Sequence, residues 1–211
     1  MACPPINRIE SQLMMLAFAP DRSLPAAECM SAFERNFMRL DLHRASLAEG
    51  RVRWPMYIER WSDHYTDAAA QLIAAAYAGH IDSRINDQYR SVAGARRFLY
   101  NIVQYPGCGS FYRPASFAAF EALNGSLCGV SLASLVAPEC GHITQICVSP
   151  RVRGTGIGYA LLRQSLQALK ETGCRTASLT VTAANDDAVQ LYERVGFRTV
   201  RRFWAYVWEG F

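Results

Sequence analysis

The stretch that decides the fold is QICVSPRVRGTGIGYALLRQSLQALKETG, residues 145–173. An apolar run ends in Ser-Pro, glycines follow at the alternate positions Gly154, Gly156 and Gly158, and an amphipathic segment comes next. This pattern predicts a buried strand, a flexible turn and a helix over 157–172. The backbone N–H groups at the start of such a helix are free. Together with the helix dipole they bind anions, phosphates above all.

The spacing of the glycines excludes two well-known phosphate-binding loops. The Walker loop, GxxxxGK[ST], requires a lysine and a hydroxyl residue after its last glycine, and neither follows Gly158. The dinucleotide fingerprint, GxGxxG, fails because the third glycine comes one residue early and no acidic residue ends a second strand at the right distance. From the glycines alone, a tight turn without a ligand remains the alternative.

Composition sets the class of protein. The 211 residues are 51% hydrophobic and 19% charged, which is typical of one globular domain or of a domain with an extension. No apolar run approaches the roughly 20 residues of a membrane span, and the N-terminus lacks the pattern of a signal peptide. We therefore expect a cytoplasmic protein without a membrane partner.

Charge and cysteine usage narrow the possible partners. The net charge of +4 is spread along the chain, so we expect no nucleic-acid partner, whereas an anionic small molecule is compatible with it. The seven cysteines are scattered and form no CxxC pair. This spacing favours reduced thiols over disulfides or a metal site.

The remaining patterns predict a mixed α/β sheet with the element order β-α-α-β-β-β-α-β-α-β. Asp63 is a plausible N-cap of the first helix, and residues 80–87 read as a polar loop. The expected elements are a strand at 54–61, helices at 65–79 and 88–105, a hairpin of 116–123 with 128–136, a strand at 142–148, the helix 157–172, a strand at 177–183, a helix at 186–195 and a strand at 197–208.

The first fifty residues differ from the rest. We assign 1–50 to an N-terminal extension and 51–211 to the main domain. Within the extension, 6–18 has helical spacing, whereas 33–42 is compatible with either a strand or a helix.

Two motifs together resemble the GNAT superfamily of N-acetyltransferases. Arg153-Gly-Thr-Gly-Ile-Gly158 fits the family signature R/Q-x-x-G-x-G/A at a strand-to-helix junction. TVTAANDDAVQLYERVGF, residues 180–197, is similar to the second half of the family pattern. The resemblance covers about residues 54–208. It implies an acyl-CoA N-acyltransferase fold with a splayed central strand, and acetyl-CoA as the cosubstrate without a metal.

The resemblance also implies which residues hold the cosubstrate. Loop amides bind the pyrophosphate of coenzyme A, the exposed backbone of the preceding strand pairs with the pantetheine arm, and Asn185 helps to hold the arm or the loop. An N-cap of helix 186–195 is the alternative role for Asn185. The residues concerned are Ile146, Cys147, Val148, Arg153, Gly154, Thr155, Gly156, Ile157, Gly158 and Asn185.

Transfer of an acetyl group to an amine needs a base, an oxyanion donor and an acid for the leaving sulfur. Tyr192 occupies the family's tyrosine position and is our candidate acid, with simple core packing as the alternative. The Val148 amide is the candidate oxyanion donor. His142 is a candidate base or a structural histidine at a strand end, and Gln145 could instead orient a water. Cys147 reads as a small buried hydrophobe rather than a nucleophile.

The acceptor is expected to be a primary amine of a small molecule or of a peptide. In the family, the connection between the first two helices lines the acceptor site. His80, Asp82, Arg84 and Asp87 are therefore acceptor-contact candidates, with capping and solvation as the alternative. A catalytically silent coenzyme A-binding module is the second hypothesis, and a nucleotide or other phosphate binder is the third.

The family sheet usually gains one more strand after the aromatic strand 197–208, but few residues follow that strand. We expect 33–42 to fill this place, either within the chain or across a homodimer, because an apolar edge is normally covered. The extension could also be the remnant of a second, truncated repeat.

Overall fold

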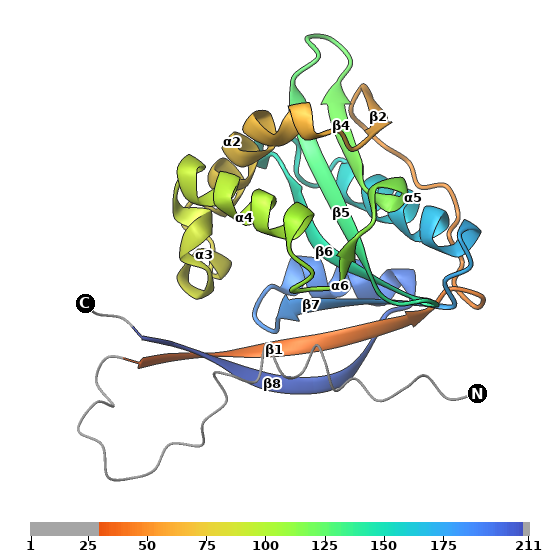
Figure 1. Cartoon of the computed structure of the whole chain (residues 1–211). Helices are drawn as coiled ribbons and strands as arrows, with labels where there is room; N and C mark the ends of the chain where they lie inside the picture. The colour runs from red at the N-terminus through yellow and green to blue at the C-terminus, as the bar shows by residue number, and fades with distance from the viewer. Residues whose placement is uncertain (1–29, 209–211) are drawn as a thin grey trace.

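The structure is a computed structural model that describes residues 30–208, so the helix expected at 6–18 lies outside the described residues. The elements, shown in Figure 1, are β1 (Met30–Asp41), β2 (Met56–Arg60), α2 (Thr66–Tyr77), α3 (Asp82–Ile85), α4 (Val92–Gln104), β3 (Ser110–Phe111), β4 (Phe117–Glu121), β5 (Leu127–Ala137), β6 (Cys140–Val148), α5 (Ile157–Glu171), β7 (Thr176–Thr182), α6 (Asp186–Val195) and β8 (Arg198–Trp208).

The strands form one mixed sheet in the order β2-β4-β5-β6-β7-β1-β8, with the short β3 beside β5. β6 and β7 are the parallel pair, and the other paired strands run antiparallel. From β2 onward the main elements follow the expected order, and α3 and β3 are additions to it.

Helices cover both faces of the sheet. Val130 and Leu132 of β5 pack in a cluster with α2 and α4. Between them, the Ser131 hydroxyl meets the Ser165 hydroxyl of α5 at 2.8 Å. Because successive side chains of a strand point to opposite faces, α2 and α4 lie on one face and α5 on the other (Figure 1). A second cluster joins α5 and α6 to β1 and β7.

The N-terminal strand β1 lies inside the sheet. It pairs with β7 along Arg35–Asp41 and with β8 along Met30–Arg39 (Figure 1). The expectation that 33–42 fills the place beside the last strand is therefore confirmed, within the chain. No strand within residues 30–208 pairs with the outer edge of β8, and Trp204 and Trp208 are 53% and 56% exposed.

Two local predictions were wrong. Asp63 does not cap α2. Its carboxylate instead accepts hydrogen bonds from the Arg113 guanidinium at 2.8 Å and the Trp61 indole at 3.2 Å. The second helix begins late, at Val92, because the Ser91 hydroxyl accepts from the Gly94 N–H at 3.0 Å and sets its first turn.

Candidate functional site

The glycine loop leads from β6 into α5 and is held from behind by the segment before β2. Arg53 donates from its backbone N–H to the Thr155 carbonyl and from its guanidinium to the Gly154 carbonyl, both at 2.8 Å. Gly154 and Gly156 have φ of +73° and +97°, a region that favours glycine. A Cβ on Gly156 would lie 2.6 Å from the Arg51 carbonyl oxygen, so the close approach also requires glycine there.

This arrangement leaves a row of donors free at the start of α5. Because Arg53 engages the loop carbonyls, the loop N–H groups are available on the other side. Among residues 30–208, the N–H groups from Gly154 to Tyr159 have no hydrogen-bond partner. Unpaired N–H groups at the positive end of a 15-residue helix form a binding site for a phosphate or another anion.

The opening beside this loop lies between the parallel strands β6 and β7. Their pairing runs from Cys140 to Ile143 and then stops. At that point Thr144 is an extra residue opposite β5, since Gln145 faces Leu132 whereas Ile143 faces Ala133. Such a bulge bends the strand that carries it, so β6 turns away from β7 as it approaches the loop.

The register shows which backbone groups of β6 face this opening. The Ser149 N–H donates to the Cys128 carbonyl at 2.8 Å, so Ser149 faces the β4–β5 side. Because the direction alternates along an antiparallel strand, the N–H and C=O groups of Ile146 and Val148 face the opening. An extended amide ligand can pair with such groups as another strand would.

Tyr192 lies on α6 and is 7% exposed. Its ring meets the Phe197 ring edge-on at 5.9 Å. Its hydroxyl has no hydrogen-bond partner among residues 30–208. Burial, and to a lesser degree the charge of Asp82, raise the pKa of Tyr192, so the phenol keeps its proton at neutral pH.

His142 lies in the closed part of the β6–β7 pair, opposite Ser178. It is 9% exposed, and its Nδ1 lies 2.9 Å from the Ser178 hydroxyl. Burial lowers the pKa of His142 to about 4, so the ring is neutral at pH values near 7. This position precedes the opening and favours the structural alternative over the role of base.

Gln145 comes directly after the bulge and joins two tyrosines that the sequence did not single out. Its Nε2 donates to the Tyr77 hydroxyl at 3.2 Å, and its Oε1 accepts from the Tyr89 hydroxyl at 3.1 Å. The two rings stack at 4.3 Å. Tyr77 is the last residue of α2, before Gly79. An aromatic residue at the end of a helix, next to a polar loop, is the sequence feature that could have pointed to Tyr77.

Cys147 shares this buried environment and is 8% exposed. Burial raises the pKa of Cys147 to about 12, and hydrogen bonding with Gln145 only partly offsets that effect. The thiol is therefore protonated at neutral pH, which agrees with its interpretation as a buried small side chain.

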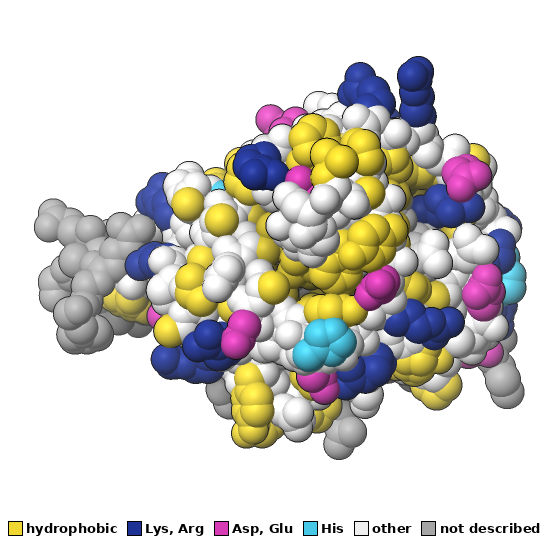
Figure 2. Space-filling model, turned by 90° about the horizontal axis from the view of Figure 1, so that it is seen from above, with side chains coloured by type: hydrophobic (Ala, Val, Ile, Leu, Met, Phe, Trp, Pro, Cys, Tyr) yellow, Lys and Arg dark blue, Asp and Glu magenta, His cyan; other side chains and the backbone are white. Residues whose placement is uncertain are grey.

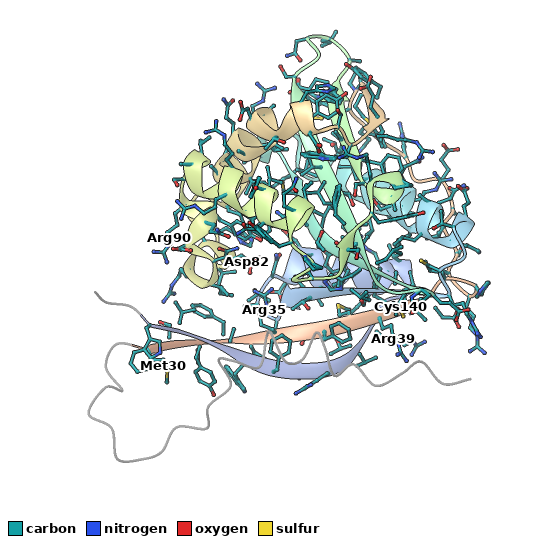
Figure 3. All side chains as sticks on the ribbon, in the orientation of Figure 1. Met30, Arg35, Arg39, Asp82, Arg90 and Cys140 are labelled. Carbon is teal, nitrogen blue, oxygen red and sulfur yellow. The ribbon has the colours of Figure 1, made fainter. Side chains whose placement is uncertain are left out.

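Asp82 ties the connection between α2 and α4 to the sheet. Its carboxylate accepts from the Thr182 hydroxyl at the end of β7 and lies 3.5 Å from the Arg35 guanidinium of β1 (Figure 3). Its backbone N–H donates to Nδ1 of His80 at 3.1 Å. Arg84 lies over the Phe33 ring at 5.2 Å. Of the acceptor-contact candidates His80, Asp82, Arg84 and Asp87, Asp82 and Arg84 are thus anchored on the N-terminal strand.

Three other predicted residues make local contacts. The Arg153 guanidinium donates to the Ala76 carbonyl at the end of α2 at 2.5 Å, and the Thr155 hydroxyl donates to the Val152 carbonyl at 2.7 Å. The Asn185 side chain accepts from the Ala188 N–H at 3.4 Å and so caps α6. The cap uses only the side-chain oxygen of Asn185, so the side-chain amide nitrogen can still donate to a ligand or to the loop.

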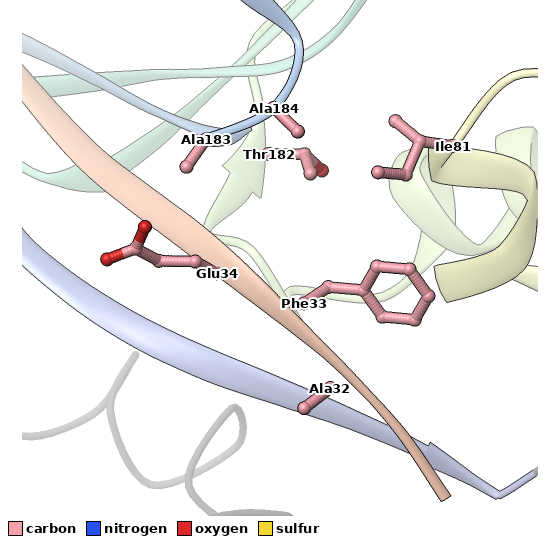
Figure 4. A pocket seen from close by; sticks show the side chains of 7 residues that line it. All are labelled: Ala32, Phe33, Glu34, Ile81, Thr182, Ala183 and Ala184. Atoms are coloured by element: carbon pink, nitrogen blue, oxygen red, sulfur yellow. The ribbon is translucent and has the colours of Figure 1, made fainter.

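A pocket of about 380 Å³ lies beside Asp82, between the start of β1, the residue before α3 and the turn after β7 (Figure 4).

In residues 30–208, no group of three or more His, Cys, Asp or Glu is placed to hold a metal ion. None of the helices in that range is long and apolar enough to cross a bilayer. On the face seen in Figure 2, acidic and basic side chains are interspersed.

Comparison with known proteins gives consistent results. The family model "Acetyltransferase (GNAT) family" matches residues 51–197. The chain is 38% identical over 90 residues to a mycothiol acetyltransferase of Streptomyces avermitilis, covering 42% of this chain and 29% of the relative. It is 35% identical over 81 residues to the ribosomal protein bS18-alanine N-acetyltransferase of Escherichia coli, covering 37% and 54%. The chain thus spans less than two thirds of either relative.

Solved structures share the fold at low sequence identity. A GCN5-related N-acetyltransferase from Sphaerobacter thermophilus has a TM-score of 0.61 at 20% identity, over 85% of this chain and 52% of that one. The Escherichia coli ribosomal-protein-S18-alanine N-acetyltransferase has a TM-score of 0.55 at 18% identity, over 74% and 95%. The family model spans well over half of the chain, and the sheet with its splayed pair has the matching fold. The chain belongs to the acetyltransferase (GNAT) family.

Proposed function

We propose that this protein transfers an acetyl group from acetyl-CoA directly to a primary amine, with Tyr192 as the acid. The observation that carries the proposal is the opening between β6 and β7. The free N–H groups of the glycine loop lie at the end of β6, and unpaired backbone groups line the opening along the same strand.

The residues present fit the cosubstrate that the family implies. The free N–H groups from Gly154 to Tyr159 suit the pyrophosphate, and a Cβ-free Gly154 leaves open space beside them. Ile146 and Val148 offer alternating N–H and C=O groups to the amides of the pantetheine arm. When bound, acetyl-CoA supplies an activated thioester. Arg153, Thr155 and Ile157 shape the loop, Cys147 lies within the same stretch of β6, and Asn185 helps to hold the pantetheine arm or the loop.

We assign the chemistry to the Val148 amide of β6 and to the Tyr192 hydroxyl of α6. The Val148 N–H, which faces the opening, stabilises negative charge that develops on the carbonyl oxygen. Tyr192, whose raised pKa keeps it protonated, donates its proton to the departing sulfur. Transfer is direct and needs no covalent enzyme intermediate, in agreement with the protonated thiol of Cys147.

The amine must lose a proton before it attacks. Gln145, held between Tyr77 and Tyr89, is placed where β6 leaves β7 and supports a water that accepts this proton. His142 remains the other candidate base. Its burial and lowered pKa make it a weaker acceptor of protons at neutral pH than an ordinary histidine.

The acceptor is a primary amine that enters between the start of β1 and the residue before α3, where the pocket lies. The names of the relatives refer to mycothiol in one case and to an alanine of ribosomal protein bS18 in the other. We place the activity in the cytoplasm. A homodimer is compatible with the open edge of β8.

The experiment is a comparison of Tyr192→Phe with the wild type. We expect kcat to fall by about 10²-fold, the range for loss of a general acid, while the affinity for acetyl-CoA stays within about twofold. Thermal unfolding with acetyl-CoA, and with ATP as the control, measures the affinity; at a hundred times Kd the unfolding free energy rises by about 2.7 kcal/mol. An unchanged kcat would remove Tyr192 from the acid role. A coenzyme-induced shift without turnover on any amine would support the silent coenzyme A-binding module instead.

A further inference from the structure

The N-terminal strand extends beyond its neighbour in the sheet. The last register pair between β1 and β7 is Arg35 with Thr182, and the Ala183 N–H donates to the Glu34 carbonyl at 2.9 Å just past it. Within residues 30–208, β1 pairs from there to Met30 with β8 alone. In that part of the chain, the edge of β1 that faces away from β8 is therefore open at Ala32 and at the Glu34 N–H.

The bond to Ala183 shows which backbone groups point toward that open edge. Because Glu34 faces β7, alternation makes Ala32 face the same side, whereas Phe33 faces β8. On the side of β7, where the register ends at Arg35, the Glu34 N–H and both backbone groups of Ala32 have no partner among residues 30–208. These groups form a short row of free donors and acceptors with the spacing of a strand edge.

The pocket described above lies at this edge. Ala32, Ala183 and Ala184 contribute only methyl groups, so another backbone can come close. Phe33 and Ile81 provide an apolar wall on one side (Figure 4). The Glu34 carboxylate also lines the pocket and has no ionic or hydrogen-bond partner among the described residues. Asp82, next to Ile81, accepts from the Thr182 hydroxyl and pairs with Arg35, so it ties the side of Ile81 to β7 and β1.

We propose that the acceptor is the N-terminus of a polypeptide, whose first residues bind in extended form along Ala32–Glu34 as a continuation of β7. This inference rests on the proposed function and names its substrate class. A strand addition uses the free backbone groups of β1 regardless of sequence, and the pocket selects side chains at alternate positions. Because residues 30–41 precede the family match at 51–197, the acceptor site depends on a strand that the family model does not include.

The test measures kcat/KM for amidated peptides of one, two, three, four and six residues that begin with alanine. We expect kcat/KM to rise with length as residues reach β1 and then to level off. In the longest peptide, N-methylation of successive amides should lower kcat/KM at every second position. Each lost hydrogen bond is worth between about twofold and about tenfold.

Two variants separate the edge from general effects. Ala32→Pro removes the N–H that faces the open edge and breaks no hydrogen bond to β8. A strand tolerates proline at such a position. It should lower kcat/KM for the six-residue peptide by about twofold to tenfold and leave the one-residue acceptor unchanged. Arg202→Pro is the matched control on β8. Its N–H points outward by the same alternation, so neither acceptor should be affected.

The outcomes are distinguishable. Equal kcat/KM for one-residue and six-residue acceptors, or N-methylation without an alternating pattern, would overturn this inference and leave the proposed function standing. Turnover on no amine, despite binding of acetyl-CoA, would overturn both. The N-methylated peptides test the inference on the wild type, so the result does not depend on the folding of Ala32→Pro.

Discussion

Replacement of His142 by glutamine gives a sharp test of whether this histidine is a structural residue or a base. The ring is buried, and its Nδ1 meets the Ser178 hydroxyl at 2.9 Å. Burial lowers its pKa from 6.5 to about 4. Between these values the unfolded chain binds more protons than the folded one, so the free energy of unfolding rises with pH through this window and falls as the solution is acidified.

The size of the effect follows from the two pKa values. Between about pH 7 and about pH 5, His142 alone should lower the free energy of unfolding by about 2 kcal/mol. His142→Gln lacks this contribution, because the amide does not titrate, although it can still bond to Ser178. Urea unfolding of both proteins at the two pH values measures the difference. Carboxylates contribute equally to both proteins and cancel in the comparison.

Equal pH dependence of wild type and His142→Gln would refute the reasoning, since it would mean that the folded ring titrates like a free one. The pH–rate profile completes the test. If His142 is the base, the acidic limb of kcat/KM has an apparent pKa of about 4 and disappears in the variant. If the limb persists, the base is elsewhere, and a water held by Gln145 is the remaining candidate.

Two further perturbations follow from the site. Gly156→Ala should lower the acetyl-CoA-induced rise in Tm, and it should destabilise the fold more than Gly154→Ala does. The positive φ costs about 1–2 kcal/mol in either variant. Only the new Cβ at position 156 also meets a carbonyl oxygen, that of Arg51, at 2.6 Å. Equal losses in the two variants would contradict the packing against Arg51. Cys147 should react with iodoacetamide far more slowly than the exposed Cys108, as mass spectrometry would show, since burial raises its pKa to about 12. Comparable labelling of the folded protein would show that Cys147 is accessible.

The helices and strands that build the glycine loop could be predicted from sequence because their determinants are local. Helix α6 runs over the expected residues, since Asn185 caps its start and Gly196, at φ of +107°, ends it. The loop glycines likewise carry their own signal in their spacing. Asp63 was misassigned because a long-range partner, Arg113, competes for the same carboxylate.

The contacts at the proposed acceptor side could not be predicted, because they join residues that are distant in the sequence. Thr182 and Asp82 are 100 residues apart, and Arg35 comes from a segment whose pattern allowed either a strand or a helix. Gln145 was noted, yet its tyrosine partners come from two different elements. Only the placement of β1 beside β7 brings Arg35 to Asp82 and forms the pocket.

The order of strands at this end of the sheet makes a final prediction about connectivity. Met30 pairs with Trp208, so the start of β1 and the end of β8 lie side by side, as in a hairpin without its turn. Moving residues 30–44 behind Trp208 through a short Asn-Gly-containing turn would keep every strand pair and only change the order along the chain. This circular permutant should fold and show the same rise in Tm with acetyl-CoA as the wild type.

Deletion of residues 1–44 is the control. It removes β1, the one strand among the described residues that pairs with β8, so it should abolish cooperative unfolding. A folded, coenzyme-binding deletion variant would show that β1 is dispensable, and an unfolded permutant would show that the fold depends on β1 being the first strand rather than on its pairing.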